Sequence, residues 1–186
     1  MNMGHDPAYI EKLKEYGKGD PTQSDIEALE NELYNAPDRA AAIVMASMVE
    51  KALRRLLSNN MREEKSTGKL FKFPGVLSSF SAKINVAYAF KLFGEKTKKE
   101  LNIIRDLRNQ FAHSRLPIEF TTPVVKRCCD ELTYPDVPSV LDSVYSRTVV
   151  GPLSRDGVDI TQPRARYKIS CEEIFMRIYL NGKLDA

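Results

Sequence analysis

The sequence is poor in the residues that build disulfides and metal sites. It has only three cysteines and two histidines among 186 residues. Cys128, Cys129 and Cys171 form no Cys-x-x-Cys pair and no even disulfide framework, so we expect reduced thiols. The histidines lack the carboxylate–histidine spacing of a metal enzyme, and glycine-rich phosphate loops, Gly-x-Ser-x-Gly elbows and protein-kinase signatures are absent. The sequence therefore predicts neither a metal site nor a cofactor.

Long apolar runs are also missing. Residues 1–6 lack the apolar stretch of a secretion signal. The longest apolar run, residues 40–49, is interrupted by Ser47 and is too short to span a bilayer. These absences predict a cytoplasmic protein with no membrane partner.

The chain has no strong excess of charge of either sign. Its formal net charge is +3 and its isoelectric point is about 8.7. This balance permits an anionic partner but falls short of the basic surface of a dedicated DNA-binding protein. A solvated surface with slightly more Lys and Arg than Asp and Glu also accounts for it. The sequence shows no convincing helix-turn-helix, so direct sequence-specific DNA binding is not expected.

Apolar residues recur at helical spacing through most of the chain. The second helix is expected to begin with Ser24 as N-cap and Glu27 three residues on. Residues 61–69 are expected to form a charged surface loop. The predicted helices cover about 7–16, 24–34, 38–58, 79–93, 97–113, 123–132 and 164–180.

This pattern predicts one all-α helical bundle. Apolar residues nearly encircle the helix at 38–58, which is typical of a central helix packed on several sides. Residues 134–163 are rich in proline and glycine and predict an irregular wrap with a short helix near 140–145. A strand over 166–170 is an alternative to the start of the last helix. We expect an N-terminal helical extension (1–36), a helical core (37–132), and a C-terminal wrap with an amphipathic helix packed on that core (133–186).

The densest chemistry lies at the end of the helix predicted over 97–113, where Arg108, Asn109 and His113 fall within six residues. At about 100° of rotation per residue, Asn109 and His113 share a polar stripe with Asn102 and Asp106, opposite the buried face. Arg108 lies roughly 140° from His113. The two can share a ligand if Arg108 bends, if the helix loosens after His113, or if two subunits pair along these helices.

Two interpretations of these residues remain open. His113 could take a proton from a ribose 2′-hydroxyl while Arg108 holds a phosphate and Asn109 orients the ring or contacts the phosphate. Alternatively, Arg108 pairs with a carboxylate such as Glu50 or Asp106, and His113 is a helix C-terminal residue placed against the dipole.

Other basic residues could add to an anion site. Ser81 and Lys83, near the start of the helix predicted over 79–93, could contact a phosphate together with Arg105; the alternative is a helix cap and an exposed lysine. A second basic stretch, Arg164, Arg166 and Lys168 with Tyr167 interleaved, could lie on a nucleic-acid backbone. Surface charge at a helix start is the alternative.

Three blocks carry a family resemblance, in order along about half the chain. They are residues 38–42 leading into 49–53, residues 77–84 followed by 87–89, and residues 104–114. Together they resemble the mannitol operon repressor (MltR-like) family over roughly 37–132. That family is similar to the HEPN superfamily, whose hallmark is R-x(4-6)-H, often with a polar residue after the Arg; Arg108, Asn109 and His113 satisfy this pattern.

The resemblance implies a compact bundle of four to six helices that often forms homodimers, with the motif at the subunit junction. In many HEPN members it implies metal-independent RNA cleavage, which would make Arg108, Asn109 and His113 catalytic. The mannitol repressor branch is instead regulatory and lacks a DNA-binding element. We therefore favour a regulator acting through protein contacts, and keep as alternative a metal-independent endoribonuclease, such as a toxin or defence effector, that cleaves RNA by 2′-hydroxyl attack.

Overall fold

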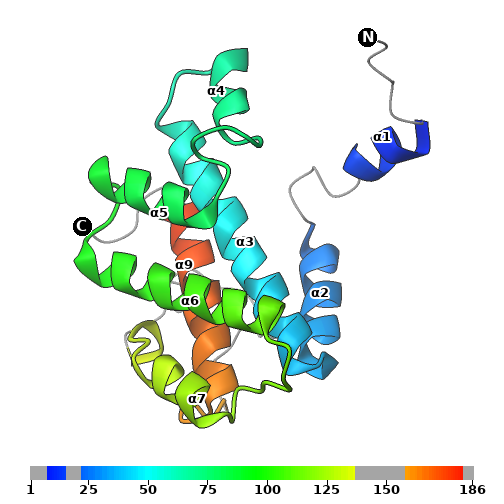
Figure 1. The fold of residues 1–186 in the computed structure, drawn as a ribbon, viewed down its shortest axis with the longest axis vertical. Helices are drawn as coiled ribbons and strands as arrows, with labels where there is room; N and C mark the ends of the chain where they lie inside the picture. The colour runs from blue at the N-terminus through cyan, green and yellow to red at the C-terminus, as the bar shows by residue number, and fades with distance from the viewer. Residues whose placement is uncertain (1–7, 16–21, 137–157, 182–186) are drawn as a thin grey trace. The chain divides into compact units, whose positions relative to one another are not determined.

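The computed structural model describes residues 8–15, 22–136 and 158–181. Every regular element in these ranges is helical, so the predicted all-α fold is confirmed (Figure 1). The chain divides into two units, Met1–Ala36 and Pro37–Ala186. The short helix expected near 140–145, and most of the irregular segment around it, lie outside the described ranges. Among the residues described, no helix is both long enough and apolar enough to cross a bilayer.

The first unit contains two helices and the second contains the rest. In the first unit these are α1 (Ala8–Glu15) and α2 (Gln23–Asn35). In the second they are α3 (Asp38–Asn59), α4 (Lys65–Leu70), α5 (Phe80–Ala89), α6 (Glu95–His113), α7 (Pro123–Asp130), the 3₁₀ turn η1 (Tyr134–Asp136) and α9 (Pro163–Asn181).

The N-terminus of α2 corrects the expected cap. The N-cap is Thr22 rather than Ser24, and Asp25 rather than Glu27 completes the capping box. The backbone N–H of Asp25 donates to Thr22 Oγ1 at 3.2 Å, and that of Thr22 donates to Asp25 Oδ2 at 2.9 Å. These bonds to Thr22 lower the pKa of Asp25. The prediction failed because two overlapping capping patterns are present and the earlier one satisfies its donors.

The second unit is organised around α3, as predicted for a helix with apolar residues on most sides. It packs most extensively on α9, and then on α6 and α5 (Figure 1). Ala41 and Leu53 on α3 are fully buried, as are Tyr167 and Ile174 on α9. The segment 166–170 is helical, so the strand alternative was wrong. α9 therefore supplies part of the central core of this unit.

Two boundaries differ from the prediction. The expected loop over 61–69 contains the start of α4, whose first turn is stabilised by a 2.7 Å bond from the Thr67 hydroxyl to the carbonyl oxygen of Arg62. α5 ends at Ala89 and not near residue 93, because Lys91 adopts a left-handed backbone conformation with φ of 56°. The chain reverses there and buries Phe93.

The cysteines give the fold a pH dependence. All three thiols are free; Cys129 on α7 and Cys171 on α9 are buried. Burial raises the pKa of Cys129 to about 12 and raises that of Cys171 well above its usual range. An unfolded thiol loses its proton above about pH 8.5 while the folded one keeps it, so stability should fall from there upward by about 1.4 kcal/mol per pH unit per buried thiol.

Urea unfolding between pH 7.5 and 10 measures this slope. Cys129→Ala should reduce it, and Cys128→Ala, at the neighbouring half-buried cysteine, serves as the control for substitution in α7. Equal slopes in both variants would contradict the assignment to the buried thiol.

Candidate functional site

The candidate site lies at the C-terminal end of α6, over a column of aromatic rings. The Phe111 and Phe120 ring centroids are 4.9 Å apart, and those of Phe120 and Tyr167 are 5.2 Å apart. All three side chains are buried. The column joins α6, the loop that follows it and α9, so the backbone beneath the motif is tightly packed.

The first two residues of α3 fix the turn that follows His113. Both terminal nitrogens of Arg39 donate to the carbonyl oxygen of Ser114 at 3.2 Å, and one also donates to that of Leu116 at 3.2 Å. Asp38 accepts from the backbone N–H of Phe120 at 2.8 Å. In the sequence, Asp38 and Arg39 appear only within a block that carries the family resemblance, and their structural role was not predicted. Two adjacent opposite charges at the start of a buried helix were the feature that could have indicated it.

Arg108 is half-buried and bonded within its own helix. Its Nη1 donates to Asn109 Oδ1 at 3.0 Å. Its charge also reaches Tyr167 on α9: burial raises the pKa of Tyr167 well above its usual range, and Arg108 partly opposes that rise. Arg108 is therefore near enough to Tyr167 to act on it electrostatically.

The carboxylates expected to pair with Arg108 have other partners. Glu50 accepts from Lys83 at 2.6 Å, and Asp106 accepts from Arg105 at 2.7 Å. Both expected pairings were wrong, because each carboxylate is already neutralised by a nearer cation. Arg108 has an amide as its hydrogen-bond partner and no ion pair within the described residues.

His113 is the last residue of α6 and is exposed. Within the part of the chain that is described, its ring makes no hydrogen bond and no ion pair. Five helical positions separate it from Arg108, a rotation of about 140°. No interaction in the described ranges joins the two side chains, so a single chain holds them in different surroundings.

Of the additional phosphate contacts expected on α5 and α6, Lys83 is excluded by its burial, whereas Ser81 and Arg105 lie near each other. Lys83 is only 4% exposed and donates to Glu50 and to the carbonyl oxygen of Ser78 at 3.2 Å, so it cannot serve a phosphate. That expectation was wrong because the lysine turns inward to α3. Ser81 and Arg105 do lie together, with Arg105 Nη1 3.4 Å from Ser81 Oγ, but Asp106 neutralises the guanidinium.

The basic residues at the start of α9 form contacts within the chain. Arg164 pairs with Asp38 at 2.7 Å, and Arg166 pairs with Asp136 at 2.7 Å. Tyr167 is fully buried and donates to the carbonyl oxygen of Ala42 at 3.0 Å. Arg164 and Arg166 therefore bind carboxylates of the same chain, and a nucleic-acid contact by this stretch stays a prediction.

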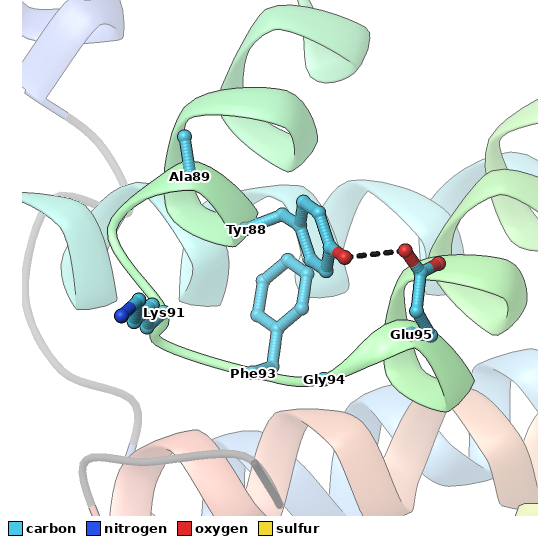
Figure 2. A pocket seen from close by; sticks show the side chains of 6 residues that line it. All are labelled: Tyr88, Ala89, Lys91, Phe93, Gly94 and Glu95. Carbon is cyan, nitrogen blue, oxygen red and sulfur yellow. Dashed lines mark hydrogen bonds between the residues drawn. The ribbon is translucent and has the colours of Figure 1, made fainter.

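A separate open hollow lies at the turn between α5 and α6 (Figure 2). Tyr88 donates to Glu95 across its rim, and this bond raises the pKa of Tyr88. Lys98 Nζ lies 3.9 Å from the centroid of the Tyr88 ring. None of the three motif residues lines the hollow, so it is distinct from the candidate site. Its lining residues are Tyr88, Ala89, Lys91, Phe93, Gly94 and Glu95.

Comparison of the chain with known protein families, with curated proteins and with solved structures found no match. Among the described residues, no group of three or more His, Cys, Asp or Glu side chains is placed to hold a metal ion. The functional argument therefore rests on the geometry at the end of α6.

Proposed function

We propose that this protein is a regulatory module of the mannitol operon repressor type, which acts through protein contacts and not by reading DNA itself. The observation that carries the proposal is the separation of Arg108 from His113. Arg108 is half-buried and bonded to Asn109, and its charge acts on Tyr167, whereas His113 is exposed at the helix end. In one chain, Arg108 acts as a packing residue and His113 as a surface residue.

The surface around His113 supports contact with a protein. Leu116, in the loop between α6 and α7, is 74% exposed, and Val124, in the first turn of α7, is 65% exposed. Arg115 is exposed between His113 and Leu116. Apolar residues combined with Arg are typical of the centre of protein interfaces. Because Arg39 holds this loop, the surface is preformed for a second copy or another protein.

Substitution of the two motif residues should separate their roles. We expect Arg108→Ala to lower the unfolding free energy by about 1–2 kcal/mol, since it removes a hydrogen bond and the packing of its stem. His113→Ala should leave the melting temperature unchanged but weaken self-association. Thermal melts and sedimentation velocity measure the two effects, with Asn85→Ala, an exposed residue of α5, as the control.

The endoribonuclease remains a second candidate, favoured by the exposed and unbonded ring of His113. It requires a second copy to bring an Arg108 to that ring. The same variants decide the matter with RNA in EDTA. Cleavage by the unsubstituted protein, lost in both variants and partly restored by mixing them, would replace the regulatory proposal with the nuclease. Intact RNA in every sample supports the regulator.

A further inference from the structure

The segment from 65 to 94 contains no acidic residue, although the chain has 25 Asp and Glu in total. Lys65, Lys69 and Lys72 lie at its start, spaced by four and three residues, so Lys65 and Lys69 share one face of α4. All three are exposed, and none forms an ion pair within the described residues. Their charge is therefore free to attract an anionic partner.

These lysines belong to a protruding turn with a fixed backbone, which we call the 65–76 tip. The N–H of Leu77 donates to the carbonyl oxygen of Leu70 at 2.8 Å and closes the turn. Phe71 and Leu77 are buried at its base. A Cβ at Gly75 would overlap the carbonyl oxygens of Lys69 and Leu70, so the backbone approaches itself as closely as glycine allows.

Large apolar side chains point outward from this fixed backbone. Phe73 is 91% exposed and Val76 is 74% exposed. Lys72 and Lys69 accompany them on the same turn. Exposed apolar side chains on a fixed turn that also carries unpaired lysines mark a contact surface.

The shape and charge of the tip select among possible partners. A folded protein needs about 800 Å² from each side for a stable interface, more than one narrow turn offers. Single-stranded nucleic acid binds along a basic groove with successive aromatic platforms, and the tip has one exposed aromatic ring, that of Phe73. A fluid anionic lipid surface requires neither a large area nor a complementary shape.

We infer that the 65–76 tip binds peripherally to an anionic lipid surface. Phe73 and Val76 enter the headgroup region while Lys65, Lys69 and Lys72 contact the lipid phosphates. The expectation of no membrane partner came from the absence of a spanning segment and a signal, and a peripheral contact requires neither. This inference goes beyond the proposed regulatory function and does not depend on it.

Tryptophan fluorescence provides the test, because the chain contains no tryptophan. Phe73→Trp places a single reporter in the tip, and Tyr34→Trp places one at an 81% exposed position on α2 as the control. The full-length variants are mixed with phosphatidylcholine vesicles, with and without one third phosphatidylglycerol. We expect a blue shift for Phe73→Trp alone, with anionic vesicles alone, and its loss at high salt.

Two matched substitutions identify the contributing side chains by vesicle co-sedimentation. Val76→Ser should weaken anionic vesicle binding, while Val158→Ser, at a 43% exposed valine outside the tip, leaves it unchanged. Lys69→Glu with Lys72→Glu should weaken binding about tenfold or more, whereas Lys51→Glu on α3 should not. Each variant is first checked for an unchanged melting temperature. If the Lys69→Glu, Lys72→Glu variant folds poorly, the fluorescence of Phe73→Trp still reports the contact, because that variant keeps both lysines.

Three outcomes overturn the inference. One is an absent blue shift with anionic vesicles, and another is an equal shift for Tyr34→Trp. The third is a shift with soluble polyglutamate or polyuridylate but none with vesicles, which would assign the tip to a protein or nucleic-acid polyanion instead.

Discussion

Replacing Glu50 with alanine should destabilise the folded protein by about 3 kcal/mol, the lower end of the range for removing one partner of a buried ion pair. The Lys83 side chain is 6% exposed and its Nζ lies 2.6 Å from Glu50 Oε1. Without Glu50, the ammonium keeps only the carbonyl oxygen of Ser78 as a hydrogen-bond acceptor. An uncompensated charge would then remain between α3 and α5. Chemical denaturation measures the loss.

The two partners are not equivalent, and this makes the prediction specific. The Glu50 side chain is 24% exposed, so water can solvate it when Lys83 is replaced. Lys83→Met should therefore cost less than Glu50→Ala, and a Glu50→Met, Lys83→Met double variant should lie close to the unsubstituted protein. A cost below 1 kcal/mol for Glu50→Ala, or a double variant less stable than both single ones, would contradict this account.

The same ion pair shows where sequence reasoning reached its limit. The apolar pattern of α3 and the start of the helix predicted over 79–93 are local features, and both were predicted correctly within a residue or two. Lys83 and Glu50 are separated by 33 positions, and no local pattern links them. An isolated lysine on a helix is exposed far more often than it is buried. Its burial follows from the packing of α5 on α3, which only the tertiary structure specifies.

The candidate site shows the same division. The angular separation of Arg108 and His113 follows from helix geometry and was available from their spacing. The hydrogen-bond partner of Arg108 was not, because Asn109 and Asp106 are both close in sequence, and Arg105 competes for Asp106. Arg39 was missed for a related reason: its acceptors are backbone carbonyl oxygens of residues more than 70 positions away. Carbonyl acceptors carry no sequence signal.

Glu100 is the other residue whose replacement should have a large effect. It is 1% exposed, and its Oε1 accepts from the backbone N–H groups of Thr133 and Tyr134 at 2.6 and 3.0 Å. The Thr133 hydroxyl donates to the same oxygen. Glu100→Ala leaves the buried N–H of Tyr134 and the half-buried donors of Thr133 without this acceptor, at about 1–3 kcal/mol for each donor that water cannot reach. The loss of a buried carboxylate offsets part of this cost, so we expect about 3 kcal/mol in all.

Glu100→Gln distinguishes the hydrogen bonds from the charge. Glu100 Oε2 is buried without a partner. An amide keeps the acceptor oxygen for Thr133 and Tyr134 but places an N–H₂ donor at the position of Oε2, which has no hydrogen-bond partner. The unfolding free energy of Glu100→Gln should therefore lie between those of Glu100→Ala and the unsubstituted protein. Glu131→Ala, which removes an exposed pair with Lys99, serves as the control and should leave the melting temperature unchanged.

Hydrogen exchange locates the effect of Glu100→Ala. The amides of Thr133 and Tyr134 should lose protection first, because their common acceptor is gone, while amides in the middle of α3 lose protection only to the extent that global stability falls. Uniform loss of protection across the second unit would show that Glu100 acts through packing alone. Local loss at residues 133 and 134 would show instead that the Glu100 carboxylate on α6 fixes the backbone that follows α7. The stability gained from these hydrogen bonds would then outweigh the cost of burying Oε2 without a partner.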